Sequence, residues 1–279
     1  MTVNSAKYHD KSPAQIVPLL ADEGKYIASE SSVYRILKKE KLLTHRQKSK
    51  PAKRKRPVEL VATRPNQVYS WDITYLQSEV KGMFFFLYLF MDVYSRKIVG
   101  FTVEEEQNTD HAAKAIKDIC KAEKIKKNQI TLHSDNGSPM KGATMLATLQ
   151  NLGVMPSFSR PSVSNDNPYS ESLFKTLKYC PQYPSKPFSS VESASEWVNE
   201  FVPWYNEEHL HSGIGFVTPA SRHKMEDIEQ LRKRDEVYKA AKARNPSRWT
   251  ADTRNWKYID RVNLNKLNKN NSSCKTKVA

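Results

Sequence analysis

The chain has 279 residues, and its 45 Lys and Arg against 30 Asp and Glu give a formal net charge of +15. An excess of this size favours a polyanionic partner, either nucleic acid or an anionic membrane surface. No apolar run reaches the ~18 residues of a membrane-spanning helix, and residues 1–12 lack the apolar core of a secretory signal. Three widely spaced cysteines argue against a disulfide framework and a structural zinc cluster. We therefore expect a cytoplasmic protein without a membrane anchor.

The charge is divided unevenly along the chain. Residues 1–57 hold 14 basic and 5 acidic side chains, residues 58–231 hold 17 and 21, and residues 232–279 hold 14 and 4. This partition predicts a slightly acidic central domain between two basic arms. The run His45 to Pro57 has seven Lys or Arg and no acid, which is typical of a self-repelling linker. Its basic cluster is either a solvated tether or, as we favour, a contact with DNA phosphates through Lys53, Arg54, Lys55 and Arg56.

The first arm contains two helix signals. Ser12-Pro13-Ala14-Gln15 predicts a helix that begins with a capping box and a proline in its first turn. A second helix is predicted after Ser29, with Val33, Ile36 and Leu37 facing inward and Arg35, Lys38 and Lys39 on the polar face. This pattern indicates a helix-turn-helix over residues 1–44, whose second helix would enter a major groove. The alternative is an ordinary helical hairpin with a solvated basic face.

The central segment changes to a pattern of strands and then alternates with helices. The predicted strands cover residues 68–77, 83–96, 97–106, 130–133 and 154–158, and the predicted helices cover residues 109–124, 142–152 and 167–179. Three strands followed by helix, strand, helix, strand and helix predict an α/β fold with a mixed five-stranded sheet flanked by helices.

Three acidic residues occupy positions that such a fold can bring together. Asp72 lies inside the first strand, Asp135 follows the fourth strand, and Glu171 lies on the helix after the fifth. A carboxylate between Trp71 and Ile73 is costly unless it is paired, and a divalent cation is a suitable partner. Oxygen ligands without thiols favour Mg²⁺ or Mn²⁺ over zinc. Any one of these acids alone is better explained as a cap, a turn residue or a surface charge, but their combined positions favour a metal site.

The motifs around these acids resemble a known signature. Asp72 in WDITYL, Asp135 in LHSDNG and, after 35 intervening residues, Glu171 in DNPYSESLFKTLKY resemble the Asp, Asp, Glu signature of the retroviral-integrase superfamily. The resemblance is to insertion sequence three family transposases, in the protein of the downstream reading frame. It runs from about Ser12 to about His223 and includes SRKIVGF (95–101), SFSRPSVSNDNPYSES (157–172) and YNEEHLHSGIGFVTP (205–219). It implies a linker over residues 45–64, an RNase H-like integrase catalytic core over 65–225, and a basic C-terminal DNA-contacting extension over 226–279.

The resemblance also implies a chemistry and roles for individual residues. Asp72 would bridge two Mg²⁺ ions, with Mn²⁺ as a possible substitute, while Asp135 would bind one ion and Glu171 the other. The implied reaction is Mg-dependent cleavage at transposon ends followed by strand transfer, which two ions assist by stabilising the attacking and leaving oxygens. Lys175 and Lys178 share the helix face of Glu171, and the family position of Lys178 contacts DNA. Asn136 is expected to orient Asp135 or the DNA, and His133 either to do the same or to be a packed, hydrogen-bonded histidine.

The implied partners are transposon terminal repeats, target DNA and further copies of the chain, as a dimer or a higher oligomer on DNA. An upstream-frame protein is a possible additional partner, and the implied location is the bacterial nucleoid. Pro139 and Met140 replace the Gln-Tyr of many members, and His209 stands where Arg is common, so we expect altered DNA contacts and retained chemistry. The first 119 residues contain no cysteine, which argues against the zinc module of retroviral integrases.

Three further alternatives stay open. The chain could be an RNase H-type nuclease, or a catalytically silent DNA-binding protein that derives from a transposase. In the C-terminal arm, Trp249, Trp256 and Tyr258 are interleaved with arginines. These aromatic residues either stack on bases or form a small apolar patch in a disordered basic tail.

Overall fold

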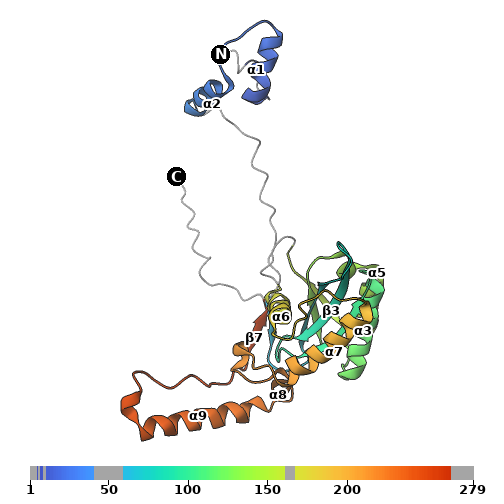
Figure 1. The fold of residues 1–279 in the computed structure, drawn as a ribbon, viewed down its shortest axis with the longest axis vertical. Coiled ribbons are helices and arrows are strands. Elements are labelled where there is room, and N and C mark those ends of the chain that lie inside the picture. Colours follow the sequence, from blue (N-terminus) through green and yellow to red (C-terminus); the bar gives the residue numbers. More distant parts are fainter. Residues whose placement is uncertain (1–4, 6, 9–10, 41–58, 161–166, 265–279) are drawn as a thin grey trace. The chain divides into compact units, whose positions relative to one another are not determined.

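The computed structural model describes residues 5, 7–8, 11–40, 59–160 and 167–264 (Figure 1). The chain divides into two compact units, residues 1–54 and residues 55–279, which are described separately. None of the described helices combines the length and apolar character that crossing a bilayer requires.

The first unit contains two helices, α1 (Pro13–Asp22) and α2 (Glu30–Lys39). Both begin as the sequence predicts: the Gln15 side chain accepts a hydrogen bond from the Ser12 backbone at 3.0 Å, and the Ser29 hydroxyl accepts from the Ser32 backbone at 3.3 Å. The two helices are in contact, and their buried apolar residues are Ile16 and Leu20 on α1 and Val33 and Leu37 on α2. Ile36 was predicted to face inward, but it is 50% exposed because the apolar face of α2 is narrower than expected.

The second unit is built on a mixed sheet in the order β4-β3-β2-β5-β6. Its strands are β2 (Val68–Gln77), β3 (Phe84–Asp92), β4 (Ile98–Glu104), β5 (Thr131–Ser134) and β6 (Met155–Phe158). Neighbouring strands among β2, β3 and β4 are antiparallel, whereas β5 runs parallel to both β2 and β6. The predicted mixed five-stranded sheet is confirmed.

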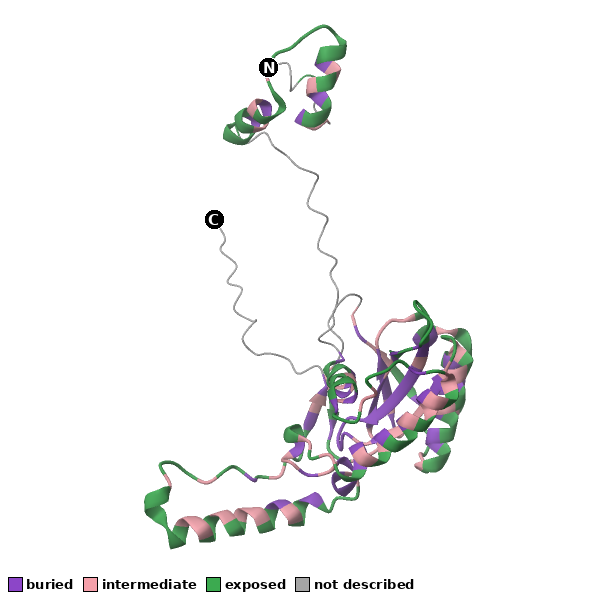
Figure 2. Ribbon diagram, in the orientation of Figure 1, coloured by how far each residue is buried: buried purple, intermediate pink, exposed green. Residues whose placement is uncertain are grey.

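Helices cover both faces of this sheet. Helices α3 (Thr109–Ala122) and α5 (Ala143–Leu152) pack against one face, over Tyr69, Trp71, Tyr88 and Phe90. Helices α6 (Pro168–Tyr179) and α7 (Val191–Glu207) pack against the other, over Leu76, Leu87, Leu89 and Met91. The strands therefore carry apolar residues on both faces, and they are largely buried in Figure 2.

The remaining elements are short or lie toward the C-terminus. They are α4 (Ser138–Lys141), the 3-10 turns η3 (Ser212–Ile214) and η4 (Pro246–Arg248), α8 (Pro219–His223), α9 (Asp227–Arg244), and the strands β1 (Leu60–Ala62) and β7 (Val262–Leu264). Strands β1 and β7 form a separate antiparallel pair, so part of the predicted linker over residues 45–64 is a strand. Much of α9 is exposed (Figure 2).

The C-terminal segment up to Leu264 packs against the core. Arg222 is fully buried, and its guanidinium donates to the Tyr94 carbonyl at 2.9 Å, to Asp227 at 2.8 Å and to the Ile259 carbonyl at 2.6 Å. Trp256, one of the aromatic residues expected either to stack on bases or to form a small apolar patch, is 9% exposed and packs with Ile214, Val217 and Leu231. Its apolar partners lie in residues 214–231, far from it in the sequence.

Candidate active site

Asp72 lies in the middle of β2, on the strand face that α6 covers. Side chains alternate along a strand, so Ser70, Asp72 and Leu76 share one face, and Leu76 packs in the apolar cluster with α6 and α7. The Asp72 carboxylate is partly buried and accepts a 2.8 Å hydrogen bond from the Ile73 backbone. Burial raises the pKa of Asp72 to about 7, and the negative charges of Asp135 and Glu171 raise it further against the opposing effect of that hydrogen bond. A cation beside Asp72 would therefore stabilise the charged form of its carboxylate.

Asp135 follows β5, the strand that pairs with β2 beside Asp72. Ser70 is directly opposite His133 in this parallel pair, which places the start of the β5–α4 loop next to the middle of β2. The Asp135 carboxylate accepts from the Gly137 backbone at 3.0 Å, a local turn that holds the side chain at the carboxyl end of β5. Because the loop is closed in this way, Asp135 keeps a fixed place beside Asp72.

The residues around Asp135 are fixed by hydrogen bonds. His133 is fully buried, and its two ring nitrogens lie 3.0 Å from the Ser157 hydroxyl and 3.2 Å from the Ser159 hydroxyl. The structure thus favours the packed, hydrogen-bonded alternative for this histidine. Asn136 is partly buried, and its amide donates to the Ser159 carbonyl. Both side chains thereby hold the loop after β5 against the end of β6.

Glu171 lies in the first turn of α6 and is exposed, as are Lys175 and Lys178 one and two turns later. Residues four and seven positions apart lie on one side of a helix, so these three side chains form a single stripe. Tyr179, which the sequence reading did not single out, is 80% exposed at the end of the same helix. The exposed face of α6 therefore combines a carboxylate, two ammonium groups and an aromatic ring.

A buried polar cluster joins α6 to β2, the two elements that carry Glu171 and Asp72. The Ser70 hydroxyl donates to the Asn167 side-chain oxygen at 2.5 Å and lies 2.7 Å from the Ser170 hydroxyl, while the Asn167 amide donates to the Trp71 carbonyl at 3.4 Å. Asn167 occupies the N-cap position of α6 but makes no side-chain cap; its side chain is used for this contact instead. The sequence gives no local signal for this contact, because Ser70 and Trp71 lie about a hundred residues before Asn167.

The three carboxylates are near one another but not preassembled. Within the ranges that the structure covers, no three His, Cys, Asp or Glu side chains are placed to hold a metal ion together. The donor set still fits a hard divalent cation, since all three groups supply carboxylate oxygens and the pKa of Asp72 rises through burial and the charges of the other two acids. A bound cation would relieve this accumulation of negative charge.

The other predicted DNA contacts fall in three places. Arg35, Lys38 and Lys39 lie on the exposed face of α2 in the first unit, opposite the buried Val33 and Leu37. Lys175 and Lys178 lie beside Glu171 in the second unit. The predicted contacts in the basic linker, which are Lys53, Arg54, Lys55 and Arg56, lie outside the described residues.

Comparison with known proteins places the site residues inside a family domain. Two profiles described as "Integrase core domain" match residues 62–164 and 152–219, and together they include Asp72, Asp135 and Glu171. The transposase for insertion sequence element IS904 of Lactococcus lactis is 29% identical over 158 residues, 57% of this chain and 61% of that protein. Transposase InsF for insertion sequence IS3A of Escherichia coli is 28% identical over 160 residues, 57% of this chain and 54% of that protein.

The chain thus spans less than two thirds of the length of these two relatives. Among solved structures, a chain of the simian T-cell lymphotropic virus intasome in complex with PP2A regulatory subunit B56 gamma aligns with 76% of this chain and 74% of its own length, at 15% identity and a TM-score of 0.49. The two family profiles together cover more than half of this chain, over the five-stranded sheet and its flanking helices. The chain therefore contains an integrase core domain over residues 62–219, and its sequence is similar to transposases of the insertion sequences IS904 and IS3.

Proposed function

We propose that the chain is a DDE transposase, a polynucleotidyl transferase that cuts the DNA ends of its own mobile element and joins them to target DNA. The observation that carries this proposal is that Asp72 on β2, Asp135 after β5 and Glu171 on α6 lie together within an integrase core domain. The charges of Asp135 and Glu171 both help to raise the pKa of Asp72, which supports their closeness to it.

In this proposal Asp72, Asp135 and Glu171 hold two Mg²⁺ ions, with Mn²⁺ as a substitute. The ions supply Lewis-acid stabilisation of the attacking and leaving oxygens of a phosphodiester. The protein's part is to keep its three carboxylates deprotonated and close together, and to present the DNA strand. Lys175 and Lys178 neutralise phosphates beside Glu171, and the Ser70–Asn167–Ser170 cluster sets the distance between α6 and β2.

Further DNA contacts are proposed at α2, through Arg35, Lys38 and Lys39, and along the basic segments that flank the core. The domain division into residues 1–44, 45–64, 65–225 and 226–279 belongs to this proposal. Joining two element ends requires at least two copies of the chain, so a homodimer or higher oligomer on DNA is part of the same proposal. An upstream-frame protein is a further proposed partner. The site of action is the bacterial nucleoid.

The test uses the full chain with labelled duplexes that carry the element's terminal repeats, in the presence of Mg²⁺. Wild type is expected to nick one strand at each end and to transfer the resulting 3′ end to a second duplex. Asp135→Asn preserves side-chain volume and removes the charge, so it should bind the same duplex and leave it intact. Asn136→Asp is not a suitable control, because the Asn136 amide holds the loop after β5 against the end of β6. The matched surface control is Lys117→Gln, since Lys117 is exposed on α3.

Two other outcomes would replace the proposal. If wild type binds the repeats but neither nicks nor joins them with Mg²⁺ or Mn²⁺, the chain is a DNA-binding protein derived from a transposase. If it cuts only the RNA strand of an RNA–DNA hybrid, it is an RNase H-type nuclease.

A further inference from the structure

Arg96, in the turn between β3 and β4, is a buried cation that no carboxylate of the described residues pairs with. It is 5% exposed, its guanidinium donates to the Val93 carbonyl, and it lies 3.6 Å from the centre of the Tyr169 ring. No acidic side chain of the described ranges forms an ion pair with it. Burying a charge is costly, and buried charges are normally paired with an opposite one.

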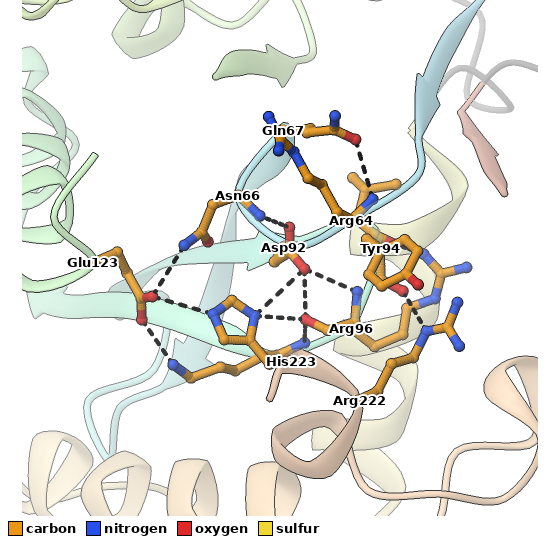
Figure 3. A network of polar contacts seen from close by, with 12 residues as sticks. Arg64, Asn66, Gln67, Asp92, Tyr94, Arg96, Glu123, Arg222 and His223 are labelled. Carbon is orange, nitrogen blue, oxygen red and sulfur yellow. Dashed lines mark hydrogen bonds and ion pairs between the residues drawn. The ribbon is translucent and has the colours of Figure 1, made fainter. Parts of the chain in front are cut away.

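The backbone at Arg96 adds to this cost. Its φ is 69°, in the left-handed region that non-glycine residues rarely adopt. The turn is held in place by Asp92, which accepts from the Asn66 backbone at 3.1 Å and from the Ser95 backbone at 2.9 Å, and by His223, which lies 3.0 Å from the Ser95 hydroxyl (Figure 3). Such rare conformations persist where the surroundings enforce them, commonly at functional sites. The contacts of this turn thus stabilise an unfavourable backbone conformation that positions the Arg96 guanidinium.

The acidic side chains near Arg96 are already engaged by other groups. The buried Asp92 carboxylate accepts from the Asn66 and Ser95 backbone and lies 3.6 Å from His223. Arg222, whose charge acts on Arg96, is paired with Asp227 at 2.8 Å. Burial and the charges of Arg96 and His209 lower the pKa of His211 to about 4, so this histidine is neutral at physiological pH. An anion that reaches Arg96 would therefore meet an attractive potential.

A surface cavity of about 360 Å³ gives access to this guanidinium. Arg96 and Tyr169 line it from the core, and the exposed Arg261 and the partly buried Asn263 line it from the segment that leads into β7. The Tyr169 hydroxyl donates to the Asn263 carbonyl at 2.9 Å, which closes one wall. The amide of Asn263 donates to Glu59 at 2.8 Å, so that carboxylate is already engaged. Two guanidinium groups thus share one cavity.

The position of the cavity relative to the candidate active site indicates the class of ligand that it binds. Tyr169 and Glu171 are two residues apart on α6, which places them about 200° apart around a helix roughly 10 Å wide. The cavity and the candidate active site therefore lie on two sides of the same helix. Each DNA strand carries one phosphate per ~3.4 Å of axis, so a strand whose reacting bond lies at Glu171 has further phosphates close to α6.

We propose that Arg96 and Arg261 form a subsite for a DNA phosphodiester that is not the one being cut. The planar guanidinium of each can donate two parallel hydrogen bonds to the phosphate oxygens. The subsite anchors the strand across α6 from the three carboxylates and so fixes which bond reaches them. This inference rests on the proposed transposase function, because DNA is its ligand.

The test replaces single phosphates of the DNA by uncharged methylphosphonates and measures binding to the full chain. For wild type, one position close to the reacting bond should weaken binding about tenfold, the value of one charge-assisted contact. Arg261→Gln, an exposed change, should remove the sensitivity at that position alone. Arg96→Lys keeps the charge but loses the planar fork, and should reduce the sensitivity without changing the rest of the profile. Lys117→Gln, an exposed loss of charge on α3, should leave it unchanged.

Scanning the terminal-repeat duplex and the target duplex separately shows which of the two DNAs supplies the phosphate. If Arg261→Gln and Arg96→Lys, with melting temperatures near that of wild type, keep the full wild-type profile, the subsite does not exist. Should Arg96→Lys fail to fold, Arg261→Gln alone decides. If wild type binds and joins unmodified DNA but shows no sensitive position, the inference fails while the proposed function stands. If wild type binds no DNA, the proposed function itself fails.

Discussion

The Ser70 hydroxyl and the Asn167 side chain share a 2.5 Å hydrogen bond, although 96 residues separate them in the chain. Ser70 is two residues before Asp72 on one strand face, and Asn167 is four residues before Glu171. Together with the Ser70–Ser170 and Asn167–Trp71 contacts, it therefore fixes the spacing between a strand carboxylate and a helix carboxylate.

Replacing Asn167 by Ala should separate catalysis from DNA binding. Loss of the amide leaves the Trp71 carbonyl and one buried hydroxyl contact unmatched, at a cost of about 2 kcal/mol in unfolding free energy. A small displacement of α6 should lower the strand-transfer rate by about a hundredfold, with the KM for DNA unchanged. Ser172→Ala, on the exposed side of the same helix, is the control. Equal rates for Asn167→Ala and wild type would contradict a positioning role.

Mg²⁺ should stabilise the protein through the three carboxylates. At about pH 8 the buried Asp72 is charged and is repelled by Asp135 and Glu171, so a cation should raise the melting temperature. Asp72→Asn should raise the melting temperature of the metal-free protein by about 3 °C and abolish the response to Mg²⁺. Thermal unfolding with and without millimolar Mg²⁺ measures both effects. A variant that keeps the full response would remove Asp72 from the ligand set.

Lys175 and Lys178 should contribute electrostatic, sequence-independent affinity. Each Lys→Gln change is expected to lower the slope of log affinity against log salt concentration by about 1, because one fewer phosphate is neutralised. Binding titrations of a terminal-repeat duplex over a range of salt concentrations give this slope. Lys121→Gln, exposed on α3, should leave the slope at its wild-type value.

The contact between Glu123 and His223 should make stability depend on acid pH. Hydrogen bonds from His223, at 3.1 Å, and Lys97, at 2.7 Å, lower the pKa of Glu123 to about 2 against the effect of burial (Figure 3). Because the pKa of Glu123 in the folded protein lies below its ordinary value of 4.5, the contribution to stability is complete above pH 4.5 and is lost as the pH falls toward 2.

Glu123→Gln should therefore cost about 2 kcal/mol of unfolding free energy at neutral pH, and the difference from wild type should shrink below pH 4.5. Urea unfolding at several pH values measures it, with the exposed Glu196→Gln as control. A difference that stays constant down to about pH 3 would show that charge is not the cause.

The C-terminal strand should be part of the cooperative fold of the second unit. Leu264 is fully buried against Ala62, Val68, Val93 and Tyr94, so Leu264→Ala is expected to cost about 3 kcal/mol. Leu210→Ala changes a side chain that is 52% exposed and should cost far less. Chemical denaturation followed by tryptophan fluorescence compares the two. Equal stabilities would mean that β7 does not contribute to the folded unit.

The main sheet could be predicted because its strands carry their own pattern. Residues 68–77 and 83–96 are long β-branched and aromatic runs, and the helices between the later strands have apolar residues at helical spacing. The pairing of β1 with β7 could not be predicted, because two three-residue strands about 200 residues apart carry no local signal. The apolar partners of Trp256 could not be predicted for the same reason, since they lie in residues 214–231.

The candidate site was predictable only in its charged members. Asp72 stands out because a carboxylate between apolar residues is costly to bury. Asp135 and Glu171 stand out because one follows a predicted strand and the other lies on the next helix but one, where the fold can bring them to Asp72. Ser70, Asn167 and Ser170 are common turn and cap residues, and their role depends on contacts across β2 and α6. Arg96 lies within SRKIVGF, but its burial and positive φ are tertiary properties that spacing cannot report.

The β1–β7 pair also brings two distant parts of the sequence together. Leu60 lies directly opposite Leu264 in an antiparallel pair, so the start of β1 and the end of β7 lie side by side. The sequence carries eight Lys or Arg over residues 41–58 and four Lys over residues 265–279, with no acid in either range. Two basic stretches of sequence thus adjoin one pair of strands. In the proposed function, a DNA phosphate bound by one stretch would be at high effective concentration for the other, as for a bivalent ligand.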